Sequence, residues 1–352
     1  MESRFKKIYD SLSDDESKYI FEKRLMYSLT GDEEYVISLG RRHEQAVLSS
    51  DKWKEFVDKL VSCGGDIALY AAGYWGRELI ARTPQIPWKY VIDKKPRTDV
   101  FCGIDLISLD QYIETGNDYN IVITSRVYFE EIKRELVEKG ISEGNIIDGA
   151  ILFDMSEGSQ YFDLSQIPHS SGREVFADVG CYDGLSAVYF DKWCAGAGFS
   201  YCFEPDKTNI ERIRRVLSNK GISSYELIDK GAWSKCETLS FVSTGNSVSH
   251  VSEDDDPFAD DTDKIEVVAL DDVLSDKGVT FIKMDIEGAE YDALMGAKRI
   301  ISEQTPKLAI CVYHKPQDIW VIPELILSYN DKYRFYLRHY SYKDNETVLY
   351  AI

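Results

Sequence analysis

Residues Glu174–Gly184 have the sequence EVFADVGCYDG, and FEPD follows at Phe203–Asp206. The apolar run through Val179 predicts a buried strand, and the residues after Gly184 predict an amphipathic helix. A second apolar run ends at Glu204. A strand, a glycine-bearing turn, a helix and a second strand that ends in an acid together predict a nucleoside site. Glycines let the backbone approach such a ligand, and the acid accepts the ribose hydroxyls.

The turn between Asp178 and Gly184 separates two kinds of nucleoside ligand. NAD sites carry G-x-G-x-x-G, with a helix N-terminus that faces a pyrophosphate. Here the turn contains two acids, Asp178 and Asp183, which would repel a pyrophosphate. A ligand with a cationic amino-acid end suits this turn better, and S-adenosylmethionine is such a ligand.

Composition limits the possible classes of protein and partner. The 352 residues suggest two domains, and 44% hydrophobic residues are ample for packed cores. A net charge of −20 argues against nucleic acids and anionic membranes as partners. The N-terminal stretch lacks a signal-peptide core, and no apolar run is long enough to span a bilayer. The seven cysteines show no zinc spacing, so we expect reduced thiols and a cytoplasmic location.

The chain is expected to form an α/β protein in four segments. Residues 1–62 predict a helical segment, and residues 63–150 predict a smaller Rossmann-like α/β domain. Residues 151–172 predict a connector that ends in the loop-like stretch SQIPHSSG. Residues 173–352 alternate strands and helices, which predicts a mostly parallel sheet covered on both faces.

A weaker form of the nucleoside pattern occurs in the second segment. Gly73 and Gly76 follow an apolar run over residues 67–72, and Asp93 follows another over residues 90–92. One interpretation is a bound nucleotide or sugar nucleotide. The other is a Rossmann-like fold in which the glycines only permit tight packing of helix against strand. Both interpretations remain open at this level.

Five motifs carry a family resemblance over roughly residues 174–350. Besides DVGCYDG (178–184) and FEPD (203–206), these are GAWS (231–234), IKMDIEGAE (282–290) and VYHK (312–315). In order and spacing they resemble FkbM-type methyltransferases. The chain departs from the common pattern at Cys181, Tyr182 and Asp183, where the family more often has Ala, Asn and an apolar residue. The segment before residue 150 resembles an N-terminal α/β domain of some bacterial members.

The resemblance implies a fold, a cofactor and a reaction. The fold would be that of class I methyltransferases, whose sheet ends in an antiparallel hairpin. The short polar gap over residues 341–346 itself suggests such a hairpin between the runs 333–337 and 347–352. The cofactor would be S-adenosylmethionine, with Asp178 and Gly180 at its methionine end and Glu204 on its ribose hydroxyls. Asp206 and Ala232 would flank the adenine. Further expected cofactor contacts are Tyr182, Asp183, Gly184, Pro205, Gly231 and Asp285.

Three acids and a histidine are the expected catalytic residues: Asp285, Glu287, Glu290 and His314. They could form a metal-free site in which His314 or a carboxylate takes a hydroxyl proton. They could instead hold Mg²⁺, which prefers hard oxygen ligands. We favour the metal-free site, because the paired acids upstream, Asp271 and Asp272, fall in a predicted helix-starting turn. The loop GNSVSH could cover the cofactor or meet the acceptor through Asn246 and His250.

The expected function is S-adenosylmethionine-dependent O-methylation of a hydroxyl on a sugar, a glycan precursor or a similar small molecule. One alternative is a sugar-modifying enzyme that binds NAD or a nucleotide sugar through the second segment. Another is a cofactor-binding module without turnover. No nucleic-acid partner and no membrane span are expected, and the sequence does not indicate the oligomeric state.

Overall fold

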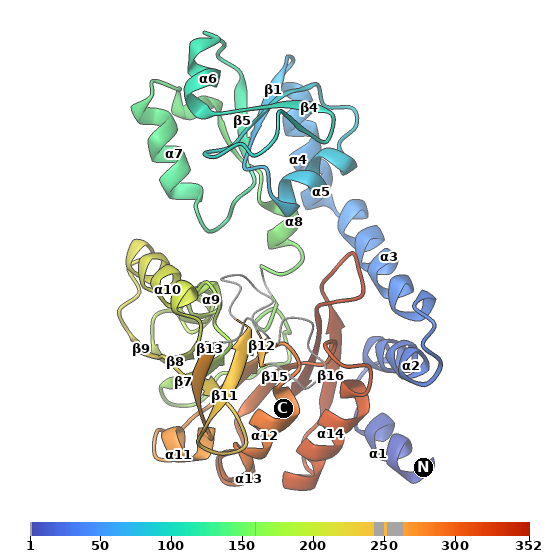
Figure 1. Ribbon diagram of the computed structural model, residues 1–352. Coiled ribbons are helices and arrows are strands. Elements are labelled where there is room, and N and C mark those ends of the chain that lie inside the picture. Colours follow the sequence, from blue (N-terminus) through green and yellow to red (C-terminus); the bar gives the residue numbers. More distant parts are fainter. Residues whose placement is uncertain (1, 159, 243–249, 252–262) are drawn as a thin grey trace. The chain divides into compact units, whose positions relative to one another are not determined.

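The structure is a computed structural model that describes residues 2–158, 160–242, 250–251 and 263–352 (Figure 1). The chain forms two compact units. Unit 1 contains Met1–His43 and Ser159–Ile352, and unit 2 contains Glu44–Gly158. This division differs from the four predicted segments, because the first helices and the expected connector pack into the C-terminal unit.

The central feature of unit 1 is a seven-stranded sheet in the order β16-β17-β15-β14-β7-β8-β9. Strands β7, β8, β9, β14 and β15 are parallel, whereas β17 runs antiparallel to both β15 and β16. The predicted mostly parallel sheet with a C-terminal hairpin is therefore confirmed. The strands are β7 (Glu174–Val179), β8 (Gly198–Phe203), β9 (Tyr225–Ile228), β14 (Phe281–Met284), β15 (Lys307–Cys311), β16 (Phe335–His339) and β17 (Thr347–Ala351).

A second, four-stranded sheet of unit 1 has the order β10-β13-β11-β12. Its strands are β10 (Gly231–Ala232), β11 (Glu237–Val242), β12 (His250–Val251) and β13 (Asp263–Val268). The helices in the C-terminal segment of unit 1 are α9 (Leu185–Trp193), α10 (Lys207–Asn219), α11 (Leu270–Leu274), α12 (Glu290–Met295), α13 (Lys298–Gln304) and α14 (Asp318–Tyr329).

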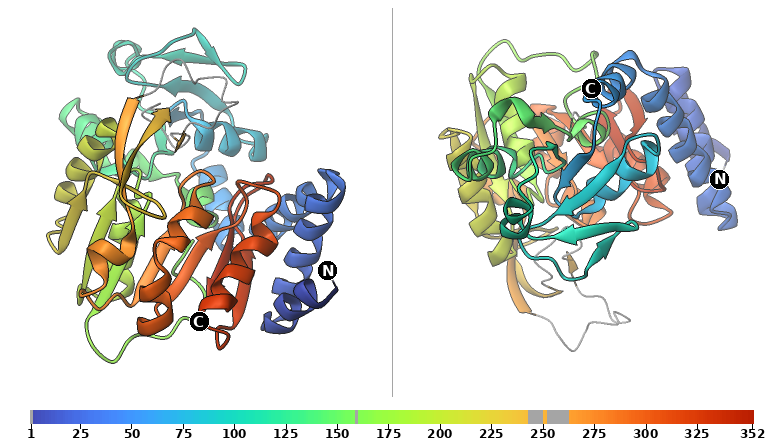
Figure 2. Two further views of the ribbon diagram at one scale, coloured as in Figure 1. Left: turned by 60° about the horizontal axis from the view of Figure 1, so that its bottom comes forward. Right: turned by 90° about the horizontal axis from the view of Figure 1, so that it is seen from above.

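Three N-terminal helices, α1 (Glu2–Ser11), α2 (Asp15–Thr30) and the first part of α3 (Glu34–Ser49), also belong to unit 1. Figure 2 shows these blue helices beside the red C-terminal strands, in agreement with the contacts between α2 and β16. Ile20 and Phe21 are buried in the same apolar cluster as Phe335. The guanidinium Nε of Arg24 donates to Thr347 Oγ1 at 2.6 Å. The predicted separate helical segment thus contributes to the core of unit 1.

Unit 2 contains a six-stranded sheet in the order β3-β4-β2-β1-β5-β6, parallel except for the β3–β4 pair. This confirms the predicted Rossmann-like α/β fold. Its elements are α4 (Asp51–Ser62), β1 (Ile67–Tyr70), α5 (Tyr74–Arg82), β2 (Trp88–Ile92), β3 (Val100–Phe101), β4 (Ile104–Ile107), α6 (Leu109–Glu114), β5 (Asn120–Ile123), α7 (Phe129–Glu138), a 3₁₀ turn (Glu143–Asn145), β6 (Ile146–Asp148) and α8 (Ile151–Asp154). In the described residues, no helix combines the length and apolar character needed to cross a bilayer.

Candidate active site

The candidate active site is an open cleft at the carboxyl edge of the main sheet in unit 1. Strands β7 and β14 are neighbours, but the chain leaves β7 toward β8 on one side and leaves β14 toward β15 on the other. Ligands bind at such a switch point in open α/β sheets. The cleft encloses about 600 Å³ of space, part of which is open to solvent.

The ionisable acids and bases that line this cleft are all acids. Three carboxylate residues, Glu204, Asp285 and Glu287, line the cleft, and no lysine, arginine or histidine is among the described residues that line it. Such a cleft attracts a cationic ligand and repels a pyrophosphate. The remaining lining residues are Gly180, Tyr182, Phe203, Pro205, Asn209, Gly231, Ala232, Phe241, Ile265, Val267, Ile286 and Ala289.

The turn after β7 lies closer to the end of β14 than a side chain would permit. Gly180 has φ +79°, and a Cβ atom there would overlap the carbonyl oxygen of Asp285 and lie 2.8 Å from Ile286 Cγ2. Lys283, itself buried, donates to the carbonyl oxygen of Gly180 at 2.5 Å. The position therefore requires glycine for both its conformation and its space.

Glu204 joins the end of β8 to the same turn. Its carboxylate accepts the backbone N–H of Tyr182 at 3.0 Å and that of Asp206 at 3.0 Å, and Asn209 Nδ2 lies 3.4 Å away. Burial raises the pKa of Glu204. The hydrogen bonds from these donors lower the pKa, but by less than burial raises it. A carboxylate oxygen has two acceptor sites, so Glu204 retains capacity to bind a ligand hydroxyl.

The opposite side of the cleft is apolar. Ala232 from β10, Phe241 from β11 and the alternating residues Ile265 and Val267 from β13 line it. All four residues are buried, with less than one-tenth of their surface exposed. A wall of this composition suits a flat heteroaromatic ring, because burial of apolar surface drives such contacts.

Asp178 lies beneath the turn and does not line the cleft. It is fully buried, accepts from Ser186 Oγ at 2.5 Å and faces Lys283 Nζ at 3.4 Å. Burial raises the pKa of Asp178, and the charge of Lys283 opposes that rise. Asp178 would therefore affect a ligand indirectly. It faces Lys283, and Lys283 donates to the carbonyl oxygen of Gly180 in the turn.

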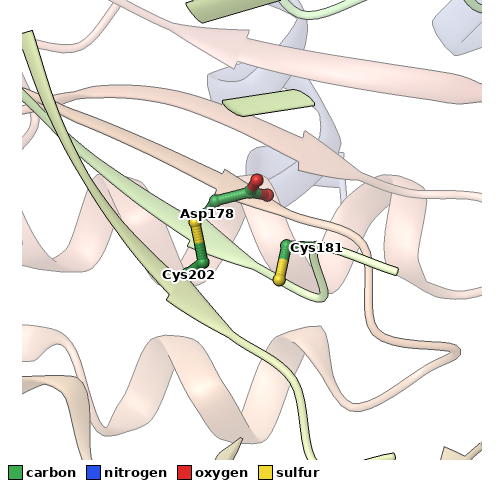
Figure 3. A group of neighbouring side chains, drawn as sticks. All are labelled: Asp178, Cys181 and Cys202. Atoms are coloured by element: carbon green, nitrogen blue, oxygen red, sulfur yellow. The ribbon is translucent and has the colours of Figure 1, made fainter. Parts of the chain in front are cut away.

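Asp178 also has two thiols beside it, those of Cys181 and Cys202 (Figure 3). One ligand atom from each lies within 4.8 Å of the others. Burial raises the pKa of the Cys181 thiol well above its usual range, which keeps the thiol protonated, whereas metals bind thiolates. Because Lys283 already faces Asp178, these residues suit a packed interior better than a metal site.

Three other predicted cofactor residues act at helix starts instead of lining the cleft. Asp206 is the N-cap of α10, and its carboxylate accepts from Thr208 N at 2.8 Å and Asn209 N at 3.3 Å. Asp183 accepts from Leu185 N at 2.9 Å. Gly184 is the N-cap of α9 with φ 81°. The acids of this stretch satisfy free N–H groups of helices, which the sequence pattern does not distinguish from ligand contacts.

Asp285, which follows β14, is held by two phenols. Tyr161 OH donates to its Oδ2 at 3.0 Å, and Tyr313 OH donates to its Oδ1 at 3.2 Å. Burial alone would raise the pKa of Asp285, but the charges of Lys283 and His314 and the bond from Tyr161 lower it overall. Asp285 is therefore a permanent carboxylate at the floor of the cleft.

His314 lies among the three predicted acids, as the sequence suggested, although it does not line the cleft. Its Nδ1 is 3.0 Å from Glu290 Oε1, and its Nε2 is 3.5 Å from Asp285 Oδ1 and 3.6 Å from Glu287 Oε2. Burial alone would lower the pKa of His314, but the three carboxylates, Glu290 first, raise it to about 10. The ring is then an imidazolium at neutral pH.

Glu290 and Glu287 differ in their surroundings. Glu290 is fully buried, and its Oε1 accepts from Ile286 N at 2.8 Å. Glu287 lines the cleft, its side chain is 27% exposed and its φ is 54°, a left-handed conformation that is rare for this residue type. Burial raises the pKa of Glu287 to about 7, and the charge of His314 limits the rise.

One donor atom each from Asp285, Glu290 and His314 lies within 4.8 Å of the others. Both ring nitrogens of His314 face carboxylates, whose charge keeps a proton on each. A metal ion bound here would have to displace the proton on one ring nitrogen. The imidazolium itself supplies the positive charge that balances these acids.

The remaining predicted residues lie elsewhere. In unit 2, Asp93 Oδ2 accepts from Ala72 N at 3.0 Å, which parallels the bond between Glu204 and Tyr182. A Cβ atom at Gly76 would lie 2.6 Å from the Ala71 carbonyl oxygen, so this glycine permits close packing, whereas Gly73 has open space around it. Asn246 lies outside the described residues. His250 lies in β12, paired with Val242, and nothing further is described of its side chain.

Several site residues had no motif to indicate them. Asn209 and Phe241 line the cleft, and Tyr161 reaches Asp285 from the segment predicted as a connector. The alternation of apolar residues over Ile265–Val267 was a usable signal for a half-buried strand. No local pattern indicates Tyr161, because its contact with Asp285 spans 124 positions.

Comparisons with known proteins relate part of the chain to methyltransferases. Residues 178–343 match the family model described as the methyltransferase FkbM domain. A structure of methyltransferase FkbM from Methylobacillus flagellatus KT is 20% identical and covers 91% of this chain and 100% of its own, with a TM-score of 0.48. No curated protein matches the sequence.

Two further solved structures are more distant. Aeropyrum pernix fibrillarin, in complex with natively bound S-adenosyl-L-methionine, is 10% identical over 54% of this chain and 71% of its own, with a TM-score of 0.34. A SAM-dependent methyltransferase from Aquifex aeolicus is 14% identical over 51% of this chain and 81% of its own, with a TM-score of 0.31. The family assignment rests on the domain model and not on these likenesses.

Proposed function

Residues 178–343 form a methyltransferase domain of the FkbM family, and from this premise we propose that the chain transfers a methyl group from S-adenosylmethionine to a hydroxyl group. The acceptor that we propose is a sugar, a glycan precursor or a similar small molecule. The observation that carries the choice of cofactor is the charge of the cleft: three carboxylates and no basic side chain among the described lining residues.

The residues of the cleft fit this cofactor. Glu204 would hold the ribose hydroxyls, since its carboxylate has acceptor capacity beyond its bonds to Tyr182 and Asp206. Ala232, Phe241 and Val267 would pack against the adenine. Asp285, held ionised by its surroundings, would face the cationic end. When bound, S-adenosylmethionine supplies an activated methyl group on a sulfonium centre.

The chain itself needs to supply orientation and a dry environment. Methyl transfer requires the acceptor oxygen to lie in line behind the methyl group, and an oriented pair reacts much faster than a free one. Gly180 fixes how closely the two strand ends approach, and the carboxylates at the cleft floor favour a neutral, hydroxyl-bearing acceptor over an anionic one.

Calorimetry with three ligands tests the cofactor. We expect S-adenosylhomocysteine to bind and NAD⁺ and UDP-glucose not to bind in unit 1. Glu204→Gln should weaken binding of S-adenosylhomocysteine by about 1.5–3 kcal/mol, the usual contribution of hydrogen bonds to a charged group. Glu303→Gln, an exposed glutamate on α13, is the matched control and should bind normally. Equal affinity in the Glu204 variant and the parent would refute the assignment.

The acceptor requires a separate experiment. Full-length protein is incubated with S-adenosylmethionine that carries a deuterated methyl group and with a panel of methyl glycosides, free hexoses and UDP-linked sugars. Mass spectrometry should find the labelled methyl on oxygen in at least one panel member. A labelled methyl on nitrogen or carbon would correct the reaction type, and no transfer despite tight cofactor binding would favour a binding module.

A further inference from the structure

We propose that Glu287 is the group that takes the proton of the acceptor hydroxyl, and that His314 is a positioning residue and not the base. The proposal deepens the proposed function and rests on it. Its basis is the arrangement of the four candidate groups around the cleft: only Glu287 among the four both lines the cleft and lacks a hydrogen-bond donor in the described part of the chain.

The carboxylate of Asp285 is already hydrogen-bonded within the protein. Each of its oxygens accepts a hydrogen bond from a phenol, that of the buried Tyr161 at 3.0 Å and that of the partly buried Tyr313 at 3.2 Å. Its pKa is lowered, since Lys283 and His314 outweigh the effect of burial. A carboxylate that is both hydrogen-bonded and stabilised in its charged form is a weak proton acceptor near neutral pH.

His314 and Glu290 are withdrawn from the cleft. The His314 side chain is 8% exposed, that of Glu290 is fully buried, and neither lines the cleft. Glu290 Oε1 accepts from Ile286 N and pairs with the His314 ring at 3.0 Å. With carboxylates at both ring nitrogens, His314 holds its protons, so it cannot accept another from a substrate.

Glu287 has the placement that a base requires. It stands in the IEG turn shortly after β14, and its backbone has a left-handed φ of 54°. Strained backbone of this kind is retained where the surrounding structure enforces it, often at active sites. Among the residues that the structure describes, the charged group paired with it is His314, 3.6 Å away.

The charged and titratable groups around Glu287 come from four segments. Asp285 follows β14, Glu290 opens α12, Tyr313 and His314 follow β15, and Glu346 precedes β17. The carboxylates and burial favour the protonated form of Glu287, and the imidazolium favours the ionised form. Their balance leaves the carboxylate able to exchange a proton near neutral pH, which is the range that suits a general base.

The step balances as follows. The acceptor O–H bond breaks and its proton passes to the Glu287 carboxylate. A lone pair of the acceptor oxygen would form the new bond to the methyl carbon. The methyl–sulfur bond would break at the same time, and sulfur would keep the electron pair of that bond. Glu287 then releases the proton to solvent through its exposed edge, and His314 keeps its charge throughout.

The first test needs no cofactor or acceptor. NMR of substrate-free, full-length protein, labelled on glutamate Cδ and histidine Cε1, should show Glu287 titrating with a pKa of about 7 and His314 still protonated at about pH 8. Assignments come from Glu287→Gln and His314→Gln. An ordinary acidic pKa for Glu287, or a neutral His314 ring at that pH, would overturn the proposal.

The second test uses the panel member that the parent enzyme methylates. Glu287→Gln should lower kcat by on the order of 10²–10⁴-fold and leave binding of S-adenosylhomocysteine unchanged by calorimetry. In the parent, kcat should fall as the pH drops below about 7, because Glu287 becomes protonated. If His314 were the base, that fall would begin at about 10.

His314 variants separate a positioning role from a purely structural one. His314→Gln removes the positive charge that lowers the Glu287 pKa, so the acidic limb of the kcat profile should move to higher pH. His314→Lys keeps a cation and should restore the limb toward the parent position. An unmoved limb in His314→Gln contradicts this role.

The controls also separate the two proposals. Glu303→Gln, exposed on α13, should match the parent throughout. Methylation that persists undiminished in Glu287→Gln overturns Glu287 as the base and leaves the proposed function intact. Failure of the parent to bind S-adenosylhomocysteine or to methylate any panel member removes the proposed function, and the assignment of Glu287 falls with it.

Discussion

Single residues set the shape of the cleft where β7 and β14 end. Gly180 and Asp285 meet there backbone to backbone, Lys283 donates to the carbonyl oxygen of Gly180, and Asp178 balances that lysine from below. Asp178 and Lys283 are buried, Gly180 and Asp285 are partly exposed, and the contacts among the four join β7 to β14. The geometry of the site therefore depends on the register between the two strands.

Gly180→Ala tests this dependence. The new Cβ would overlap the Asp285 carbonyl oxygen, so the two strand ends must separate, and we expect loss of S-adenosylhomocysteine binding together with destabilisation. Gly196→Ala is the matched control, because Gly196 also has positive φ but open space around it. The control should cost only about 1 kcal/mol through conformational strain. Chemical unfolding and calorimetry give both quantities, and similar losses in the two variants would contradict the close-approach argument.

Some of these residue roles were accessible from the sequence and others were not. The strand–turn–helix pattern with Glu204 predicted the location of the cleft, because local periodicity and glycine placement determine those elements. The pairing of Tyr161 with Asp285 and the ring of carboxylates around His314 arise only when distant segments meet. For the same reason, the sequence could suggest His314 as a base but could not indicate that its neighbours would keep it protonated.

At the level of elements, an ion pair joins the amino-terminal ends of β7 and β15 in the main sheet. Lys307 begins β15 and Glu174 begins β7, and their side chains meet at 2.8 Å across the start of β14, where Thr280 also donates to Glu174. Both side chains are less than one-tenth exposed. Burial alone would raise the pKa of Glu174, but Lys307, Ser170 and Thr280 lower it overall.

Lys307→Met should destabilise the protein by about 3–5 kcal/mol, since it leaves Glu174 buried without its cation. Because the folded-state pKa of Glu174 is lowered, the pair stabilises at neutral pH and that stabilisation is lost as the pH falls through the acidic range. The difference between parent and variant in urea unfolding should therefore be nearly the same at about pH 5.5 as at about pH 7, and should shrink at about pH 3.5, below the ordinary glutamate pKa.

Lys277→Met provides the comparison for a surface pair. Lys277 faces Asp276 at 3.4 Å with both side chains exposed, and such pairs contribute about 0–1 kcal/mol. If the Lys307 variant loses no more stability than the Lys277 variant, the buried pair does not hold these strands in register.

Element prediction succeeded where periodicity was strong and failed where pairing decided the structure. The C-terminal hairpin was anticipated from two apolar runs and a short polar gap, and β16 and β17 do pair antiparallel. The separate four-stranded sheet that contains β11 and β13 was not predicted. The short strands β3 and β4 were missed, because two to four residues give too little periodicity.

In the whole molecule, one unit interrupts the other along the sequence. Unit 1 is built from both ends of the chain, with unit 2 between them in sequence. Composition shifts and loop-like stretches predicted a boundary near residues 165–172. Tyr161, Leu164 and Ile167, however, pack with Phe176 and Tyr350 in one apolar cluster, so that stretch belongs to the core of unit 1.

Excision of unit 2 tests this division. A variant in which residues 1–43 are joined to residues 160–352 by a flexible Gly/Ser linker should unfold cooperatively and bind S-adenosylhomocysteine like the full chain. Residues 173–352 alone should not, because they lack Ile8, Ile20 and Phe21, each worth about 1.5–3 kcal/mol of burial. Circular dichroism and calorimetry decide, and a stable, binding 173–352 piece would show that the N-terminal helices are dispensable.

The contact between the first helices and the last strands has a consequence during synthesis on the ribosome. Arg24 bonds to Thr347, 323 positions later, and Ser13 N donates to Phe335 O at 2.9 Å. At about 5–20 residues per second, α1 and α2 leave the exit tunnel well before β16 and β17, and they make this contact only after those strands have emerged. Unit 2, complete once Gly158 has emerged, can fold in the meantime. The apolar face of α1 and α2 is thus the surface that a chaperone bound to the nascent chain would meet longest.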